Sequence, residues 1–292
     1  MLARRAEAGV KTAGGVALVG AGPGDPGLLT VRGRRLIRRA DVVVYDRLVD
    51  ARLLELVSPH ARVVFVGKER GHHTEPQEAI NALLVTEARR GHRVVRLKGG
   101  DPFVLGRGGE EAAALRAAGV CFEVVPGVSS AVAAPAYAGI PVTYRGVASS
   151  FAVVTGHECS GKGKRVDWAA LATAVDTIVV LMGAGRLQAI ARELISHGRA
   201  ADTPTAVVRS ATTREQETVI TTLGGIAAGD ARLPAPVVMV IGEVVALRPT
   251  LRWFDRKKSA EAQAPRYARR TWSSASKSDA RPSSTTRPVS IT

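Results

Sequence analysis

The chain has 292 residues, of which 46% are hydrophobic and 23% are charged, and its formal net charge is +15. This length suffices for one large or two medium α/β domains with full cores, and no run of about 18 apolar residues exists that could cross a membrane. Only 4% of the residues are aromatic, so side chains that stack on bases are scarce, and a polyanionic small molecule explains the charge as well as a nucleic acid does.

The first half of the chain alternates short valine-rich runs with amphipathic segments. The leader, residues 1–14, lacks a continuous apolar stretch, so it is not a secretory signal, and we expect it to be flexible. We expect strands at residues 16–19, 41–45, 62–66, 93–97 and 121–125, and helices at residues 28–39, 77–90 and 110–118. Continuous apolar strands separated by helices are typical of a parallel sheet buried on both faces.

The same pattern resumes after an alanine-rich stretch at residues 129–138. We expect strands at residues 151–155, 177–182, 205–209 and 237–241, and helices at residues 187–197 and 224–228. These patterns predict an N-terminal α/β domain of residues 15–130 and a C-terminal α/β domain of residues 131–253, with largely parallel sheets. Residues 254–292 are rich in Ser, Thr, Arg and Pro without a hydrophobic period, so we expect a disordered basic tail.

Cysteine and histidine usage argues against a metal site. Cys121 and Cys159 are the only cysteines, and no histidine stands at metal-ligand spacing from either. The adjacent His72 and His73 would point apart in a strand, and no carboxylates are patterned around them. We predict no metal and no disulfide framework, which fits a reducing cytoplasmic location.

A glycine-rich turn at residues 20–27, GAGPGDPG, follows the first expected strand. It contains G-x-G-x-x-G, and Asp46 stands about 20 residues further on, so a dinucleotide-binding site is a competing interpretation. Pro23 and Pro26 remove backbone N–H donors from this turn, and Asp25 would repel a phosphate. The turn therefore favours a cationic or neutral ligand.

Motifs along the chain resemble one family. They are GAGPGDPGLLT (residues 20–30), VVYDRLV (43–49), GKER (67–70), LKGGDPFVLGRGGEE (97–111), VPGVSS (125–130), GIPVT (139–143) and GEVV (242–245). Together they resemble the tetrapyrrole methylase family, and within it the uroporphyrinogen-III C-methyltransferases, which also form the methylating half of siroheme synthases. The resemblance covers residues 15–252.

The resemblance implies two α/β domains with S-adenosylmethionine bound in a cleft between them, the fold of class III methyltransferases. It implies a homodimer that methylates uroporphyrinogen III twice, at C2 and C7, giving precorrin-1 and then precorrin-2 for siroheme or cobalamin synthesis. The leader is too short for a dehydrogenase or ferrochelatase domain, so we expect other chains to catalyse the later steps to siroheme.

The resemblance also implies roles for individual residues. Asp46 matches the proton acceptor, Lys68 the proton donor, and Arg107 an arginine of the reaction cleft. Arg47 and Arg145 are further candidates for binding the carboxylate arms of the substrate. The positions implied to contact the cofactor are Pro23, Gly99, Gly100, Asp101, Val104, Ser129, Ser130, Met182 and Ala211.

Four of these residues have alternative interpretations, and the first is that Lys68 is a solvated lysine at the end of a strand. Asp46 could cap the next helix, Met182 could pack in the core, and Arg107 could form a surface ion pair with Glu110 or Glu111. Ala211 stands where related sequences usually have glycine, and its methyl group would weaken cofactor binding if the backbone there approaches the adenine closely.

Other functions compete with this one. A related methylase could act on a later corrin precursor or on a ribosomal RNA nucleoside, and the basic tail favours RNA. A nicotinamide-dependent oxidoreductase and a non-catalytic binding module are the alternatives of other classes. Because few aromatic residues are interleaved with the basic ones, we expect an acidic tetrapyrrole rather than a nucleic acid as partner, and no membrane.

Overall fold

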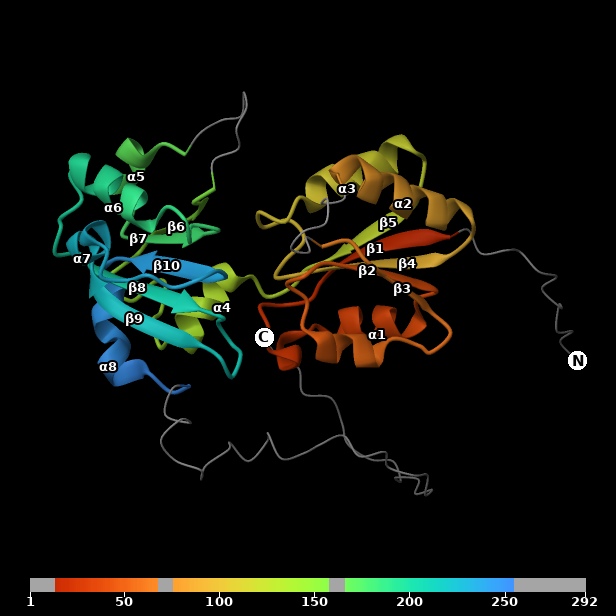
Figure 1. The fold of residues 1–292 in the computed structure, drawn as a ribbon, viewed down its shortest axis with the longest axis horizontal. Coiled ribbons are helices and arrows are strands. Elements are labelled where there is room, and N and C mark those ends of the chain that lie inside the picture. Colours follow the sequence, from red (N-terminus) through yellow and green to blue (C-terminus); the bar gives the residue numbers. More distant parts are fainter. Residues whose placement is uncertain (1–13, 68–75, 158–165, 255–292) are drawn as a thin grey trace, which may run out of the picture. The chain divides into compact units, whose positions relative to one another are not determined.

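Two five-stranded sheets organise the protein (Figure 1). The computed structural model describes residues 14–67, 76–157 and 166–254. Nearly all of the leader, the expected proton donor Lys68 and the basic tail lie outside these residues, so the predictions made for them stay predictions. Within the described ranges, no helix has the length and apolar character needed to cross a membrane.

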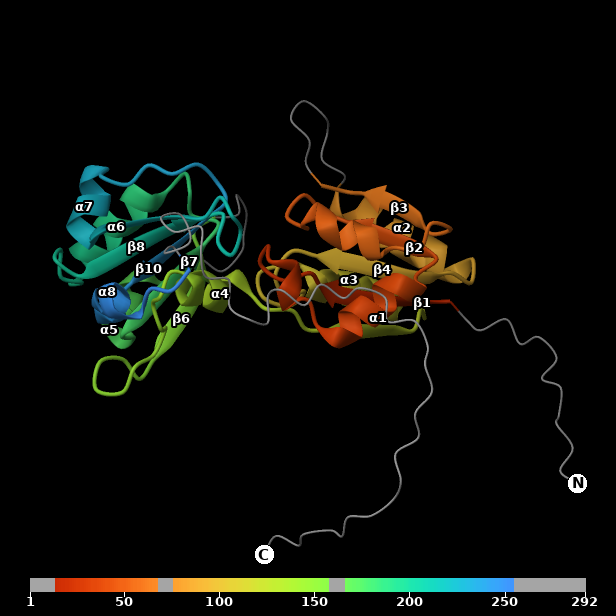
Figure 2. The same ribbon diagram turned by 90° about the horizontal axis from the view of Figure 1, so that it is seen from below.

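The first sheet is entirely parallel, as predicted, with the strand order β3-β2-β4-β1-β5 (Figure 2). Its strands are β1 (Gly15–Gly20), β2 (Val42–Tyr45), β3 (Arg62–Phe65), β4 (Arg93–Lys98) and β5 (Phe122–Val125). Its helices are α1 (Val31–Arg39), α2 (Gln77–Arg89) and α3 (Gly108–Ala117), with short 3-10 helices η1 (Pro26–Leu28) and η2 (Ala51–Leu56). The expected helix at residues 28–39 is thus divided, because Thr30 caps α1 by accepting a hydrogen bond from the Gly33 N–H.

Successive side chains of a strand point to opposite faces of a sheet. In the first sheet, helices pack against both faces and bury them. Leu18 of β1 belongs to a cluster with Leu84 of α2 and Leu115 of α3. Its neighbour Val19 belongs to a second cluster with Ile37 of α1. Figure 1 shows α2 and α3 on one side of the sheet and α1 on the other. This two-sided burial explains why the strands are continuous apolar runs.

The second sheet differs from the prediction. Its order is β6-β7-β10-β8-β9, and only β6 and β7 are parallel; every other neighbouring pair is antiparallel. The strands are β6 (Phe151–Thr155), β7 (Thr177–Leu181), β8 (Pro204–Arg209), β9 (Glu217–Thr222) and β10 (Val237–Ile241). The expectation of a largely parallel sheet is wrong here. β9 was not predicted, because an edge strand with partly exposed side chains has no continuous apolar run.

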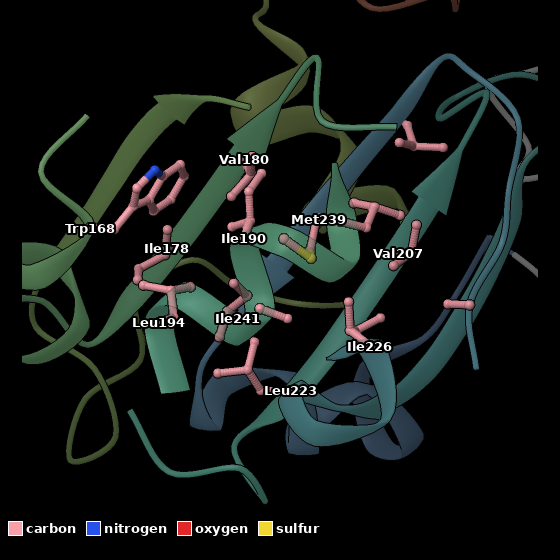
Figure 3. Packing of buried hydrophobic residues seen from close by; sticks show 14 of the residues in the cluster. Trp168, Ile178, Val180, Ile190, Leu194, Val207, Leu223, Ile226, Met239 and Ile241 are labelled. Atoms are coloured by element: carbon pink, nitrogen blue, oxygen red, sulfur yellow. The ribbon is translucent and has the colours of Figure 1, made fainter. Parts of the chain in front are cut away.

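One face of the second sheet packs against α5 (Trp168–Ala174), α6 (Leu187–Ser196) and α7 (Leu223–Ala228). Figure 3 shows Trp168, Leu194 and Ile226 from these helices beside Ile178 of β7 and Met239 of β10. All five side chains are buried. Apolar side chains from these helices and from the strands of the sheet thus form one core.

The other face packs against α4 (Ser130–Tyr137) and η3 (Glu243–Leu247), and α8 (Arg248–Leu251) follows η3. Ala131 and Ala134 of α4 are buried against Val179 and Val240 of the sheet. The alanine-rich stretch is therefore a helix that belongs to the core of the second sheet. The division into domains of residues 15–130 and 131–253 stays a prediction.

Candidate active site

The loops that follow β1 and β4 lie side by side at the carboxyl end of the first sheet. The Gly22 N–H donates to the Gly100 carbonyl at 3.2 Å, and the Gly100 N–H donates to the Gly22 carbonyl at 2.7 Å. The turn that holds Pro23 is thereby joined to the Gly99-Gly100-Asp101 loop. Ligands of open α/β sheets bind beyond the carboxyl ends of the strands, where this pair lies.

The loop after β5 approaches the same place, and only glycine permits the approach. A Cβ added to Gly127 would lie 2.2 Å from the Gly100 carbonyl oxygen, and one added to Gly20 would lie 2.5 Å from the Gly127 Cα. Gly100 also has a left-handed φ of +68°. Gly20 and Gly127 were not among the predicted site residues, although both stand in motifs that carry the resemblance.

The Asp101 carboxylate braces these loops. One oxygen accepts the Phe103 N–H at 2.8 Å and the other accepts the Gly127 N–H at 3.0 Å. Next to this point α4 begins: Ser129 caps it by accepting the Ala131 N–H at 3.2 Å, and Ser130 is its first residue. The structure thus brings the predicted residues at positions 99–101, 129 and 130 together.

Asp46 follows β2 at the same end of the sheet. Its Oδ1 accepts the Leu48 N–H at 3.1 Å, and its Oδ2 lies 3.4 Å from the Nη2 of Arg96. The helical segment that follows is capped by Asp50 instead, so the interpretation of Asp46 as a helix cap is wrong. A Cβ added to Gly99 would lie 2.7 Å from the Leu48 Cβ, so the turn of Asp46 also touches the glycine loop.

A buried group of charged side chains lies next to Asp46 and contacts it through Arg96. Arg96 and Lys98 of β4 are each 4% exposed, and Glu111 of α3 is fully buried. The Glu111 Oε1 lies 2.8 Å from the Lys98 Nζ and 3.1 Å from the Arg96 Nε. Burial lowers the pKa of Lys98, and the positive charge of Arg96 lowers it further. This group was not predicted, although charged residues next to apolar ones in a predicted buried strand were a signal for it.

Strained backbone marks several predicted positions. Of the residues in ranges 14–67, 76–157 and 166–254, five other than glycine have left-handed φ values, between +44° and +70°. They are Leu105, Arg107, Met182, Ser210 and Thr212. Two are predicted site residues, and the other three adjoin Val104 or Ala211. Such conformations cost about 1–3 kcal/mol each and concentrate at functional sites.

Met182 and Val104 are exposed rather than buried. Met182 follows β7 and is 53% exposed, and Val104 is 39% exposed. Core packing of Met182 is therefore excluded. Ala211 is the opposite case, because its methyl group belongs to the core cluster under α4 and is only 8% exposed. The glycine expected at that position is thus replaced by a residue whose side chain packs inward.

The three candidate arginines differ in their surroundings. Arg107 forms an ion pair with Glu110, with its Nη2 2.6 Å from the Glu110 Oε2, and both side chains are more than half exposed. This is the surface pair that the sequence left open as an alternative. Arg47 is exposed next to Asp46, and Arg145 is exposed in the turn closed by Tyr144 and Ala148. Their roles in substrate binding stay predictions.

The glycine turn does not have the geometry of a dinucleotide fingerprint. That fingerprint places the pyrophosphate at a helix N-terminus. Here α1 begins only at Val31, and Asp25 and η1 separate it from Gly24. Within the described part of the chain, no group of three or more His, Cys, Asp or Glu residues is arranged to hold a metal ion.

The fold and these motifs define a class of methyl-transferring enzymes. The family model for tetrapyrrole (corrin/porphyrin) methylases matches residues 15–227, and the chain belongs to this family.

Individual relatives can be named more narrowly. Siroheme synthase 1 of Yersinia enterocolitica is 50% identical over 248 residues, which are 85% of this chain and 52% of that protein. The chain thus spans about half the length of this relative. Uroporphyrin III C-methyl transferase from Thermus thermophilus is 47% identical with a TM-score of 0.71, and the match covers 80% of this chain and all of that one. A second structure of the Thermus enzyme, in complex with S-adenyl homocysteine (S-adenosylhomocysteine), matches with the same identity, TM-score and coverage.

Proposed function

We propose that the chain is an S-adenosylmethionine-dependent uroporphyrinogen-III C-methyltransferase. It would methylate C2 and C7 in succession, forming precorrin-1 as the intermediate and precorrin-2 as the product, for siroheme or cobalamin synthesis. The observation that carries this proposal is the match to the full length of the Thermus enzyme at 47% identity. The structure of that enzyme with S-adenyl homocysteine supports S-adenosylmethionine as the methyl donor.

The described loops fit this cofactor chemically. Exposed Met182 and Val104 offer soft apolar contacts for a thioether and an adenine ring. The Asp101 carboxylate accepts two backbone N–H groups and still has lone pairs for a hydroxyl or ammonium group. When bound, S-adenosylmethionine supplies an electrophilic methyl group on a sulfonium sulfur.

The residues of the chain would then orient the substrate and move a proton. We assign to Asp46 the removal of a proton from the substrate macrocycle as, or after, one of its ring carbons gains the methyl group; that carbon is then fully substituted, so the proton leaves from a neighbouring position. The carboxylate suits this role because backbone and Arg96 contacts fix both of its oxygens. We assign to Lys68 the donation of a proton, and to Arg107, Arg47 and Arg145 the binding of substrate carboxylates. For Arg107, this role requires its pair with Glu110 to open.

We also propose a homodimer in the cytoplasm, with neither nucleic acid nor membrane as partner. The family resemblance implies the dimer, and few aromatic residues that could stack on bases are interleaved with the basic ones. Analytical ultracentrifugation would measure the oligomeric state directly.

Transfer of labelled methyl groups separates the proposed function from its competitors. The protein is incubated with labelled S-adenosylmethionine and, in parallel, with uroporphyrinogen III, ribosomal RNA or no acceptor. We expect label in a dimethylated tetrapyrrole, with a monomethylated intermediate at early times. Label found only in RNA would overturn the proposal, as would tight cofactor binding without transfer to either acceptor.

A further inference from the structure

A closed ring of hydrogen bonds joins three segments that are distant in sequence. The Asp25 N–H donates to the Thr212 hydroxyl at 2.9 Å, and the Thr212 N–H donates to the Gln216 Oε1 at 2.8 Å. The Gln216 Nε2 donates to the Tyr137 carbonyl at 3.1 Å, and the Tyr137 hydroxyl donates to the Asp25 Oδ2 at 3.0 Å. The ring connects the turn after β1, the end of α4 and the loop between β8 and β9.

Two of the four residues in the ring are buried, and Asp25 and Tyr137 are half-buried. Thr212 and Gln216 are each 4% exposed. The Thr212 N–H needs an acceptor, which fixes the orientation of the Gln216 amide and leaves its NH₂ group for the Tyr137 carbonyl. A buried polar group that loses its partner is costly, so each link favours the geometry of the next.

Glycine and strained backbone let the segments approach. Gly24 has φ +145°, and a Cβ added there would lie 2.8 Å from the Thr213 Cγ2 and 3.0 Å from the Thr212 Oγ1. Ser210 and Thr212 have left-handed φ values of +44° and +70°. A strained backbone conformation persists only where surrounding contacts stabilise it. For Thr212, the two hydrogen bonds that it makes within the ring are such contacts.

Two predicted cofactor positions adjoin members of the ring in the sequence. Pro23 stands two residues before Asp25, and Ala211 stands immediately before Thr212. We infer that the ring of Asp25, Thr212, Gln216 and Tyr137 positions these two loops for S-adenosylmethionine, and that Tyr137 and Gln216 are positioning residues of the cofactor site. This inference rests on the proposed function. It also gives Asp25, which the sequence suggested only as a repellent for phosphate, a structural role in the turn.

Two variants open the ring at different links. Tyr137→Phe removes the hydroxyl and keeps the aromatic ring, whose centroid lies 4.9 Å from those of Trp253 and Phe254. Gln216→Leu removes both amide links. We expect each variant to raise the dissociation constant of S-adenosylhomocysteine and the KM for S-adenosylmethionine about tenfold, with kcat changed less than about threefold. Because one broken link already opens the ring, the double variant should cost less than the product of the single effects.

Thr203→Val is the matched control. Thr203 is also a buried residue, immediately before β8, and its hydroxyl donates to the Ala200 carbonyl at 2.7 Å, outside the ring. This variant should lower the thermal midpoint and leave cofactor affinity unchanged. For the two ring variants, the double variant, Thr203→Val and the wild type, calorimetry measures the affinity for S-adenosylhomocysteine. Thermal midpoints and initial rates of methyl transfer are measured for the same proteins.

The outcomes separate the two proposals. If the wild type neither binds S-adenosylhomocysteine nor transfers methyl groups, the proposed function is wrong and the inference falls with it. If the wild type binds and both ring variants bind equally well, the proposed function stands and the inference is overturned. A loss of affinity in Thr203→Val equal to that in the ring variants would also overturn it, because general destabilisation would then explain the effect.

Discussion

Single residues at the carboxyl end of the first sheet show how a short polar side chain is fixed for chemistry. Asp46 has its two oxygens held by different groups, the Leu48 N–H and the Arg96 guanidinium. Arg96 is itself anchored by the Glu111 carboxylate and by the Leu97 carbonyl at 3.1 Å. A carboxylate held in this way loses little freedom when a substrate binds, which favours its action as a base.

Asp46→Asn tests this role. The amide keeps the size of the side chain and the acceptor for the Leu48 N–H but cannot take up a proton. We expect kcat to fall by about 10²-fold or more, while the dissociation constant of S-adenosylhomocysteine stays nearly unchanged. The measurements are steady-state methyl transfer and calorimetry.

Asp50→Asn in the same loop is the control. Asp50 caps the Arg52 N–H and pairs with the Arg52 side chain, so this change should affect stability rather than turnover. An unchanged rate in Asp46→Asn would remove Asp46 from the mechanism.

At the scale of elements, polar contacts fasten the strands where apolar packing ends. Asp41 precedes β2 and accepts both the Arg93 N–H, at 2.8 Å, and the Arg93 Nη2, at 2.6 Å, at the start of β4. Hydrogen bonding from the Arg93 side chain, opposed by partial desolvation, lowers the pKa of Asp41 to about 2. The pair thus ties the amino ends of two central strands together.

Asp41→Asn should make stability less dependent on acid. The folded pKa lies below the unfolded value of about 3.9, so the charged form stabilises the protein above that pH and this contribution is lost as pH falls towards 2. Because the pair is partly exposed and screened, we expect the variant to lose only about 1 kcal/mol in unfolding free energy at pH 7. Urea unfolding at pH 7 and at about pH 3 measures the difference between the two proteins. A difference that stays constant between these pH values would contradict the assignment.

At the scale of the whole molecule, the packing of the described residues continues past the cores of the two sheets. Among residues 14–67, 76–157 and 166–254, the four core clusters contain no residue beyond Val245. Trp253 and Phe254 then pack against the Tyr137 ring, and the Trp253 indole donates to the Ala136 carbonyl at 3.0 Å. The packing that we describe therefore extends through Phe254.

Truncation after Phe254 should leave the thermal midpoint and methyl transfer unchanged. A second truncation after Leu251 removes Trp253 and Phe254 as well, and we expect it to lower the midpoint, because Tyr137 loses its aromatic neighbours. Thermal unfolding and the transfer assay compare both with the full chain. Loss of folding in the protein truncated after Phe254 would show that the tail contributes to the structure.

The sequence by itself determined the local structure and the family. Each strand of the first sheet was predicted to within one residue at each end. The family resemblance implied that the glycine loops at residues 20–27 and 99–101 contact one cofactor, and the structure places these loops in contact with each other. The strands and turns themselves are readable because periodicity, β-branched runs and glycine turns reflect forces between neighbours in the chain.

Only the tertiary structure decided how distant segments pair. The antiparallel order of the second sheet, the contact of Asp46 with Arg96 and the ring that links Asp25 to Thr212, 187 positions apart, left no pattern in the sequence that we could read. Strand direction and buried polar partners are settled by whole-core packing and by the need to satisfy every buried donor and acceptor. Those conditions involve residues that only the folded chain brings together.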